Sequence, residues 1–207
     1  MIGKGDLEVA TEFPSLIVSK QVSAFETEWF AIQVLEEQFS LSSKGALTPA
    51  LADLAIGILS LIPHTPITAI GLNFLAHYRL PSAADYHRVG DVLAPKSIWT
   101  SLFSQENTST GLADLTIRVQ RTDEHRKSIS ADEKRISVQP SGTIPYGVFF
   151  LYNDHRAIEP ASTGKTPAEQ AASIVESSWE SSWRDAVRIF DGVLLLALTD
   201  NTQATSA

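Results

Sequence analysis

The chain has 207 residues, of which 43% are hydrophobic and 19% charged, and its formal net charge at pH 7 is −8. This acidic balance argues against a surface dedicated to DNA or RNA, because phosphates are neutralised by clustered Lys and Arg, although it leaves room for a local basic patch. The sequence contains no cysteine, which excludes disulfides, a thiol nucleophile and a thiolate metal site.

A chain of this length is long enough for a sizeable core, and we expect a single domain over residues 1–198, followed by a flexible polar tail over 199–207. Residues 1–13 contain no apolar core of the kind that export signals carry, so we expect a cytoplasmic protein. Residues 7–25 read as an extended segment.

Residues 25–41 are compatible with two structures. As a helix, the segment has an apolar stripe on one face and a capping box from Ser23 and Glu26, but Phe30 and Val34 then point to solvent. As a strand, it is rich in β-forming residues and leaves the core near Glu36. We favour the strand and keep the helix as the alternative.

The centre of the chain is predicted to be a buried helix that leads into a long strand. Residues 54–78 contain no Asp, Glu, Lys or Arg, so we expect them to be largely buried. Thr48 and Pro49 suit the N-cap and the first helical position, and the apolar residues that follow recur at spacings of three and four. The PHTP segment at 63–66 ends the helix, after which apolar residues alternate up to Leu80. A membrane span is rejected because this break would lie in mid-bilayer.

Three further strands are predicted over residues 112–121, 135–139 and 146–157, and an antiparallel meander is the simplest topology for them. In the first of these, Leu115, Ile117 and Val119 should point inward. The charge-dense residues 122–134 read as a solvated hairpin connection. Before the meander, Ser82 and Asp85 begin a helix that ends near Leu93, and residues 97–103 form a second helical piece.

A long C-terminal helix begins at Thr166, where Pro167 and Glu169 complete a capping box. Its apolar stripe extends towards Leu198, and Gly192 leaves open whether the helix bends or ends there. The predicted fold is therefore α+β: a mostly antiparallel sheet with the central helix and the C-terminal helix packed on it. Because the stripe exceeds what one sheet face can cover, we expect its later part, with Trp183, Phe190 and Leu194, to contact a second chain.

The order of elements around Ile70-Gly71-Leu72-Asn73 resembles a family of uncharacterised, sporadically distributed bacterial proteins, which also end in a long helix. Ala69 and Phe74 stand where that family often has a paired Arg and Tyr. The resemblance implies the same fold and no known activity.

One polar grouping is a candidate binding site, because alternation places its members on one face of two strands beside Gly71 and Gly147. These residues are Asn73, His77, Arg79, Asn153 and His155. If the two strands are neighbours, amide, imidazole and guanidinium groups meet at one sheet end, where His155 could act as a general base and Arg79 could hold an anion. The alternative is that these residues are strand ends reaching solvent, or part of a subunit contact.

No cofactor or metal is expected. Residues 164–166, GKT, match the end of a phosphate-binding loop, but Glu159 replaces its first glycine, so a helix start is favoured. The leading hypothesis is a non-enzymatic interaction or assembly protein, a subunit of a homo-oligomer or of a larger bacterial complex, with a protein partner or self-association and without nucleic acid or membrane. The alternative is a protein or enzyme that binds a small anionic molecule at the polar grouping.

Overall fold

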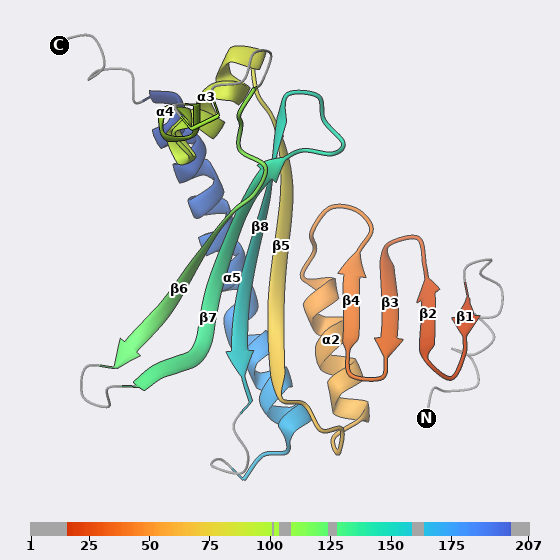
Figure 1. Ribbon diagram of the computed structural model, residues 1–207. Coiled ribbons are helices and arrows are strands. Elements are labelled where there is room, and N and C mark those ends of the chain that lie inside the picture. Colours follow the sequence, from red (N-terminus) through yellow and green to blue (C-terminus); the bar gives the residue numbers. More distant parts are fainter. Residues whose placement is uncertain (1–15, 101, 104–108, 124–127, 159–163, 200–207) are drawn as a thin grey trace. The chain divides into compact units, whose positions relative to one another are not determined.

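The computed structural model describes residues 16–100, 102–103, 109–123, 128–158 and 164–199 (Figure 1). The chain divides into two compact units. The first comprises residues 1–68 and 158–178, and the second comprises residues 69–157 and 179–207. The single domain predicted over residues 1–198 stays a prediction.

The first unit contains a small antiparallel sheet of four consecutive strands, in the order β1-β2-β3-β4. The strands are β1 (Ile17–Val18), β2 (Val22–Glu26), β3 (Phe30–Leu35) and β4 (Phe39–Ser43). None of their side chains is fully buried. The strand favoured for residues 25–41 is confirmed, but one continuous strand was wrong, because two turns divide it.

Local hydrogen bonds produce those turns. The Thr27 hydroxyl accepts from the backbone N–H of Phe30 at 3.0 Å, and the N–H of Thr27 donates to the Phe30 carbonyl at 2.8 Å. The N–H of Leu35 donates to the Gln38 carbonyl at 2.7 Å. A threonine side chain that bonds its own backbone favours a turn over a continuing strand.

Helix α2 (Ala50–Leu61) lies where the central helix was predicted, and Thr48 Oγ1 accepts from the N–H of Ala50 at 3.3 Å. Pro49 already has helical backbone angles. The expectation that residues 54–78 are largely buried was wrong in places, since Leu61 is 70% exposed and Leu75 is 62% exposed. An uncharged segment can therefore still present apolar side chains to solvent.

The second unit contains a four-stranded antiparallel sheet in the order β5-β8-β7-β6. Its strands are β5 (Ala69–Arg79), β6 (Leu115–Asp123), β7 (Ser128–Pro140) and β8 (Gly147–Ala157). The predicted meander and the alternation along β5 are confirmed. The predicted connection over residues 122–134 was too long, because β6 continues to Asp123 and β7 already begins at Ser128.

Three helices accompany this sheet: α3 (Ala83–Leu93), α4 (Lys96–Thr100) and α5 (Pro167–Thr199). Ser82 caps α3 by accepting from the N–H of Asp85 at 3.1 Å. Helix α5, which belongs to both units, begins with the predicted capping box, in which the N–H of Thr166 donates to Glu169 Oε2 at 2.7 Å. It continues through Gly192 without a break. Among the described residues, no helix combines the length and apolar character that crossing a membrane requires.

From Trp179 onward, α5 packs on one face of the second sheet (Figure 1). The ring of Phe190 lies 5.0 Å from that of Phe150, and Trp179 lies 5.2 Å from Phe74. The predicted α+β class is confirmed, with the strands divided between two sheets. The inward positions on β6 were only partly correct: Ile117 and Val119 are on the helix side of the sheet, yet they remain 49% and 51% exposed.

Candidate functional site

The predicted polar residues lie on the face of the second sheet turned away from α5, here called the polar face. Strands β5 and β8 are neighbours, as the site hypothesis required, with Asn73 opposite Asn153 and Gly71 opposite His155. Asn153 Nδ2 donates to Asn73 Oδ1 at 2.7 Å. A Cβ atom at Gly71 would lie 2.9 Å from Asn153 Nδ2, so the missing side chain provides the room for this amide pair.

His77 and Arg79 form a separate group, further along β5. His77 is four residue steps along the strand from Asn73, which is about 13 Å. His77 lies opposite Phe149, with ring centroids 4.7 Å apart, and Arg79 lies opposite Gly147 at the strand end. The five predicted residues therefore share one face but do not form one site.

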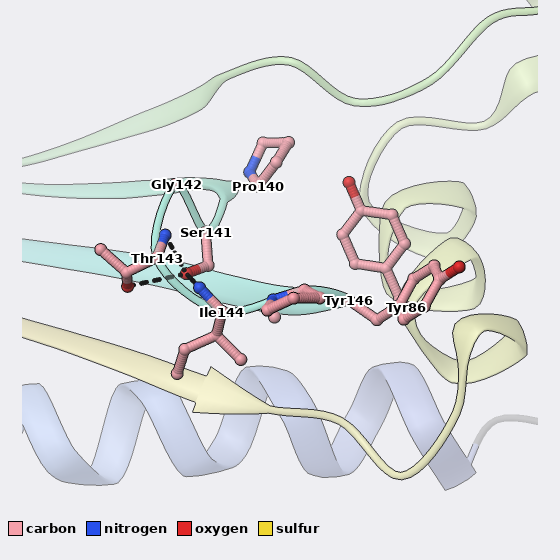
Figure 2. A pocket seen from close by; sticks show the side chains of 9 residues that line it. Tyr86, Pro140, Ser141, Gly142, Thr143, Ile144 and Tyr146 are labelled. Atoms are coloured by element: carbon pink, nitrogen blue, oxygen red, sulfur yellow. Dashed lines mark hydrogen bonds between the residues drawn. The ribbon is translucent and has the colours of Figure 1, made fainter.

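His77 contacts two hydroxyl groups of the turn between β7 and β8. Ser141 Oγ accepts from the N–H groups of Thr143 at 3.2 Å and Ile144 at 2.9 Å, which uses both of its lone pairs (Figure 2). His77 Nδ1 lies 2.9 Å from Ser141 Oγ and 3.3 Å from Thr143 Oγ1. A serine beside a histidine is the pair that a nucleophile and its base require, but here both lone pairs of Ser141 stabilise the turn.

The turn from Pro140 to Gly147 lines a cavity of about 260 Å³, together with Tyr86. Figure 2 shows the rings of Tyr86 and Tyr146 next to each other at one end, and their centroids are 6.2 Å apart. Tyr146 adopts a left-handed backbone conformation with φ of 54°. Ligand pockets usually measure about 300–1,000 Å³, so this cavity suits no more than a small group.

Gly147 is required by the close packing of this turn. An added Cβ atom would lie 2.7 Å from Ile144 Cβ and 2.9 Å from the Ile144 carbonyl oxygen. We expect Gly147→Ala to lower the free energy of unfolding by about 2 kcal/mol, because a backbone atom has to move. Urea denaturation measures this, and Gly142→Ala is the control, since nothing lies within 4 Å of a Cβ atom there. Equal effects of the two substitutions would contradict the packing.

Sequence reasoning missed four residues of β6 and β7 that continue the polar face. They are Arg118, Gln120, Glu133 and Arg135, here called the arginine cluster. The Glu133 carboxylate is only 7% exposed and pairs with both guanidinium groups. Arg118 Nε lies 3.2 Å from Glu133 Oε2, and Gln120 Nε2 donates to the same oxygen at 3.3 Å.

In register, the arginine cluster adjoins the predicted residues, with Glu133 opposite His155 and Arg135 opposite Asn153. Alternation had indicated that Arg118 and Gln120 point outward. The position of Glu133 was hidden because residues 122–134 were interpreted as a connection. Glu133 and Arg135 are two residues apart, so on a strand they share a face, and this spacing was the signal for the cluster in the sequence.

A second charged network lies between the sheet and α5, around the buried Asp154. Its carboxylate accepts from Arg156 Nε at 2.7 Å and from Ser182 Oγ at 2.6 Å. Burial raises the pKa of Asp154, but the bonds from Arg156 and Ser182 outweigh this and hold it below its usual value. Lys134 pairs with Asp185 on α5 at 2.7 Å. These contacts attach the helix to the sheet.

Neither a family model, nor a curated protein, nor a solved structure matches this chain. The resemblance to a bacterial family therefore stays an expectation. Within the described ranges, no group of three or more His, Asp or Glu residues is placed to hold a metal ion.

Proposed function

We propose that this protein is an assembly subunit that acts by binding protein chains, with a second copy of itself as its partner. The observation that supports this most directly is the apolar surface left on β6, one of the two edge strands of the second sheet. Ile117 and Val119 lie on the helix side of that strand and remain about half exposed. A strand edge with such residues is suited to pairing with another strand.

The sequence of β6 suits a copy of itself. If two β6 strands pair antiparallel with Ile117 opposite its own copy, Leu115 lies opposite Val119 and Thr116 lies opposite Arg118. All apolar pairs then fall on the helix side and all polar pairs on the polar face. The pairing β6 makes with β7 is regular up to Gln120, where its register shifts, so the self-complementary part is also the regular part.

Electrostatics favour the same arrangement. Two chains of net charge −8 repel each other, and a contact between copies is best made where the negative charge is low. In the regular part of β6, residues 115–120, Arg118 is the single charged residue, and this register places it opposite the neutral Thr116. No like charges face each other, which is the condition under which cross-strand pairs stabilise a sheet.

The interface predicted on α5 is a rival to this one. Phe190 is only 2% exposed and packs against Phe150 and Tyr78 of its own chain, so it offers no surface to a partner. Trp183 and Leu194 are half-buried, and their contact with a second chain stays a prediction.

Ile117→Lys tests the β6 contact. It places two like charges opposite each other at the centre of the paired strands, and we expect the dimer Kd to rise at least about tenfold. Sedimentation over a concentration series measures this. Leu61→Lys is the matched control, because Leu61 is 70% exposed and belongs to the first unit.

Trp183→Ala distinguishes a contact on α5 from a contact on β6. If it dissociates the assembly while Ile117→Lys does not, the contact is on α5 and the β6 proposal is wrong. A wild-type chain that stays monomeric at about 100 μM would contradict self-assembly altogether, since even weak dimers with Kd in the micromolar range are populated there.

A further inference from the structure

We propose that the arginine cluster is a binding site for a small oxyanion, a phosphate or a carboxylate. The site is formed by Arg118 and Arg135 on the polar face, with Asn153 and His155 of the neighbouring strand β8 beside them. Arg118 also belongs to the segment of β6 proposed to pair with a second copy, whereas Arg135 lies on β7, outside that contact.

Glu133 holds the two guanidinium groups in position. This carboxylate is almost fully buried, Arg135 pairs with one of its oxygens, and Arg118 and Gln120 contact the other. Arginine side chains lose much rotational freedom when they bind a ligand. Two that are already fixed by a buried carboxylate lose less, and this arrangement therefore favours anion binding.

The guanidinium groups retain donors that face solvent. Arg118 is 59% exposed and Arg135 is 50% exposed along the side chain. Arg118 contacts Glu133 through Nε and Arg135 contacts it through Nη2, and each guanidinium has five N–H bonds, more than one carboxylate can accept. The planar fork that remains matches the oxygens of a carboxylate or phosphate.

The charge and the neighbours of the cluster also suit an anion. Two arginines and one glutamate give a local charge of +1 on a chain whose net charge is −8. On the neighbouring strand β8, Asn153 has one amide N–H beside the one it donates to Asn73, and His155 adds an imidazole. Gly71, opposite His155, has no side chain to cover them. Two arginines are far fewer cations than a nucleic-acid surface presents, so the site is matched to a small molecule.

Titration of the full chain with inorganic phosphate, and separately with succinate, tests the site by NMR chemical-shift changes or calorimetry. We expect saturable binding of at least one of the two anions. The one that binds more tightly shows whether the natural ligand carries a phosphate or a carboxylate. Arg135→Gln should weaken that binding about tenfold, the effect expected for a lost charge-assisted hydrogen bond. Arg118→Gln should also weaken anion binding about tenfold, so one variant remains for the measurement if the other folds poorly.

Arg184→Gln is the matched control, because it removes the same charge from an exposed position on α5. Binding that is unchanged in this control and weakened in the two cluster variants supports the site. The proposal is overturned if neither anion binds at about 10 mM, a concentration that detects millimolar Kd values, or if all three variants weaken binding equally.

Discussion

Replacing Phe150 with alanine should destabilise the second unit by about 4 kcal/mol, since truncating a buried phenylalanine removes apolar burial and leaves a cavity. Phe150 is a fully buried residue of β8. Its ring packs 5.0 Å from Phe190 of α5 and 5.6 Å from Tyr78 of β5, so one substitution weakens the contact of the helix with two strands. Urea denaturation followed by circular dichroism measures the change.

The adjacent residue is the control for this prediction. Phe149 is also a phenylalanine of β8, but it points to the polar face, where it is half-buried against His77. Phe149→Ala should cost about 1 kcal/mol, because the ring is only partly removed from water. Equal losses for Phe149→Ala and Phe150→Ala would show that the assignment of the two faces of β8 is wrong.

Replacing Asp154 with alanine should lower the free energy of unfolding by about 3 kcal/mol. The substitution leaves the Arg156 guanidinium without its closest partner and the buried Ser182 hydroxyl without its acceptor. Glu180→Ala is the control, because Glu180 is exposed on the same helix. A loss of the same size in that control would contradict the network.

The same carboxylate gives stability a defined pH dependence. The pKa of Asp154 is lower in the folded chain than its ordinary value of 3.8, so the folded state binds the proton less readily than the unfolded state. The stabilisation is complete above that ordinary value and is lost as the pH falls through the lower pKa of the folded chain. Denaturation of wild type and Asp154→Asn at a series of acidic pH values should show a larger loss in the wild type, because Asp185, whose pKa is also lowered by its bond from Lys134, titrates in both.

Local features of this fold could be predicted because each depends on a few neighbouring residues. Ser82 and Asp85 begin α3, and Thr166 and Glu169 begin α5, since a capping box is complete within one turn of helix. The alternation along β5 has the same local character, because successive side chains of any strand point to opposite faces.

Features that depend on how much of the sheet a packed helix covers could not be predicted. Ile117 and Val119 alternate in the same way as the buried Ile136 and Val138 of β7, and nothing in their own segment shows that α5 leaves the outermost strand uncovered. The strand region over residues 25–41 was recognisable by composition. The first of its two turns depends on Thr27, and threonine is also common in uninterrupted strands.

The candidate site was predictable as far as its members lie on one strand. Asn73 and His77 share a face by alternation, and the pairing of β5 with β8 brings Asn153 and His155 to the same face. The arginine cluster arises from a register across three strands, in which Gln120, Glu133 and His155 form one row. Such a row depends on where the hairpin between β6 and β7 turns, and the charged residues 122–134 do not indicate that position.

The first sheet, in which no side chain is fully buried, has a thermodynamic consequence. The heat capacity of unfolding and the denaturant m-value both scale with the surface that unfolding exposes. Residues such as Val18, 72% exposed, and Phe39, 41% exposed, have much of that surface in water already. Loss of this sheet would therefore contribute little to either quantity, and the curvature of stability with temperature would come from the second sheet and from the buried residues of α2 and α5.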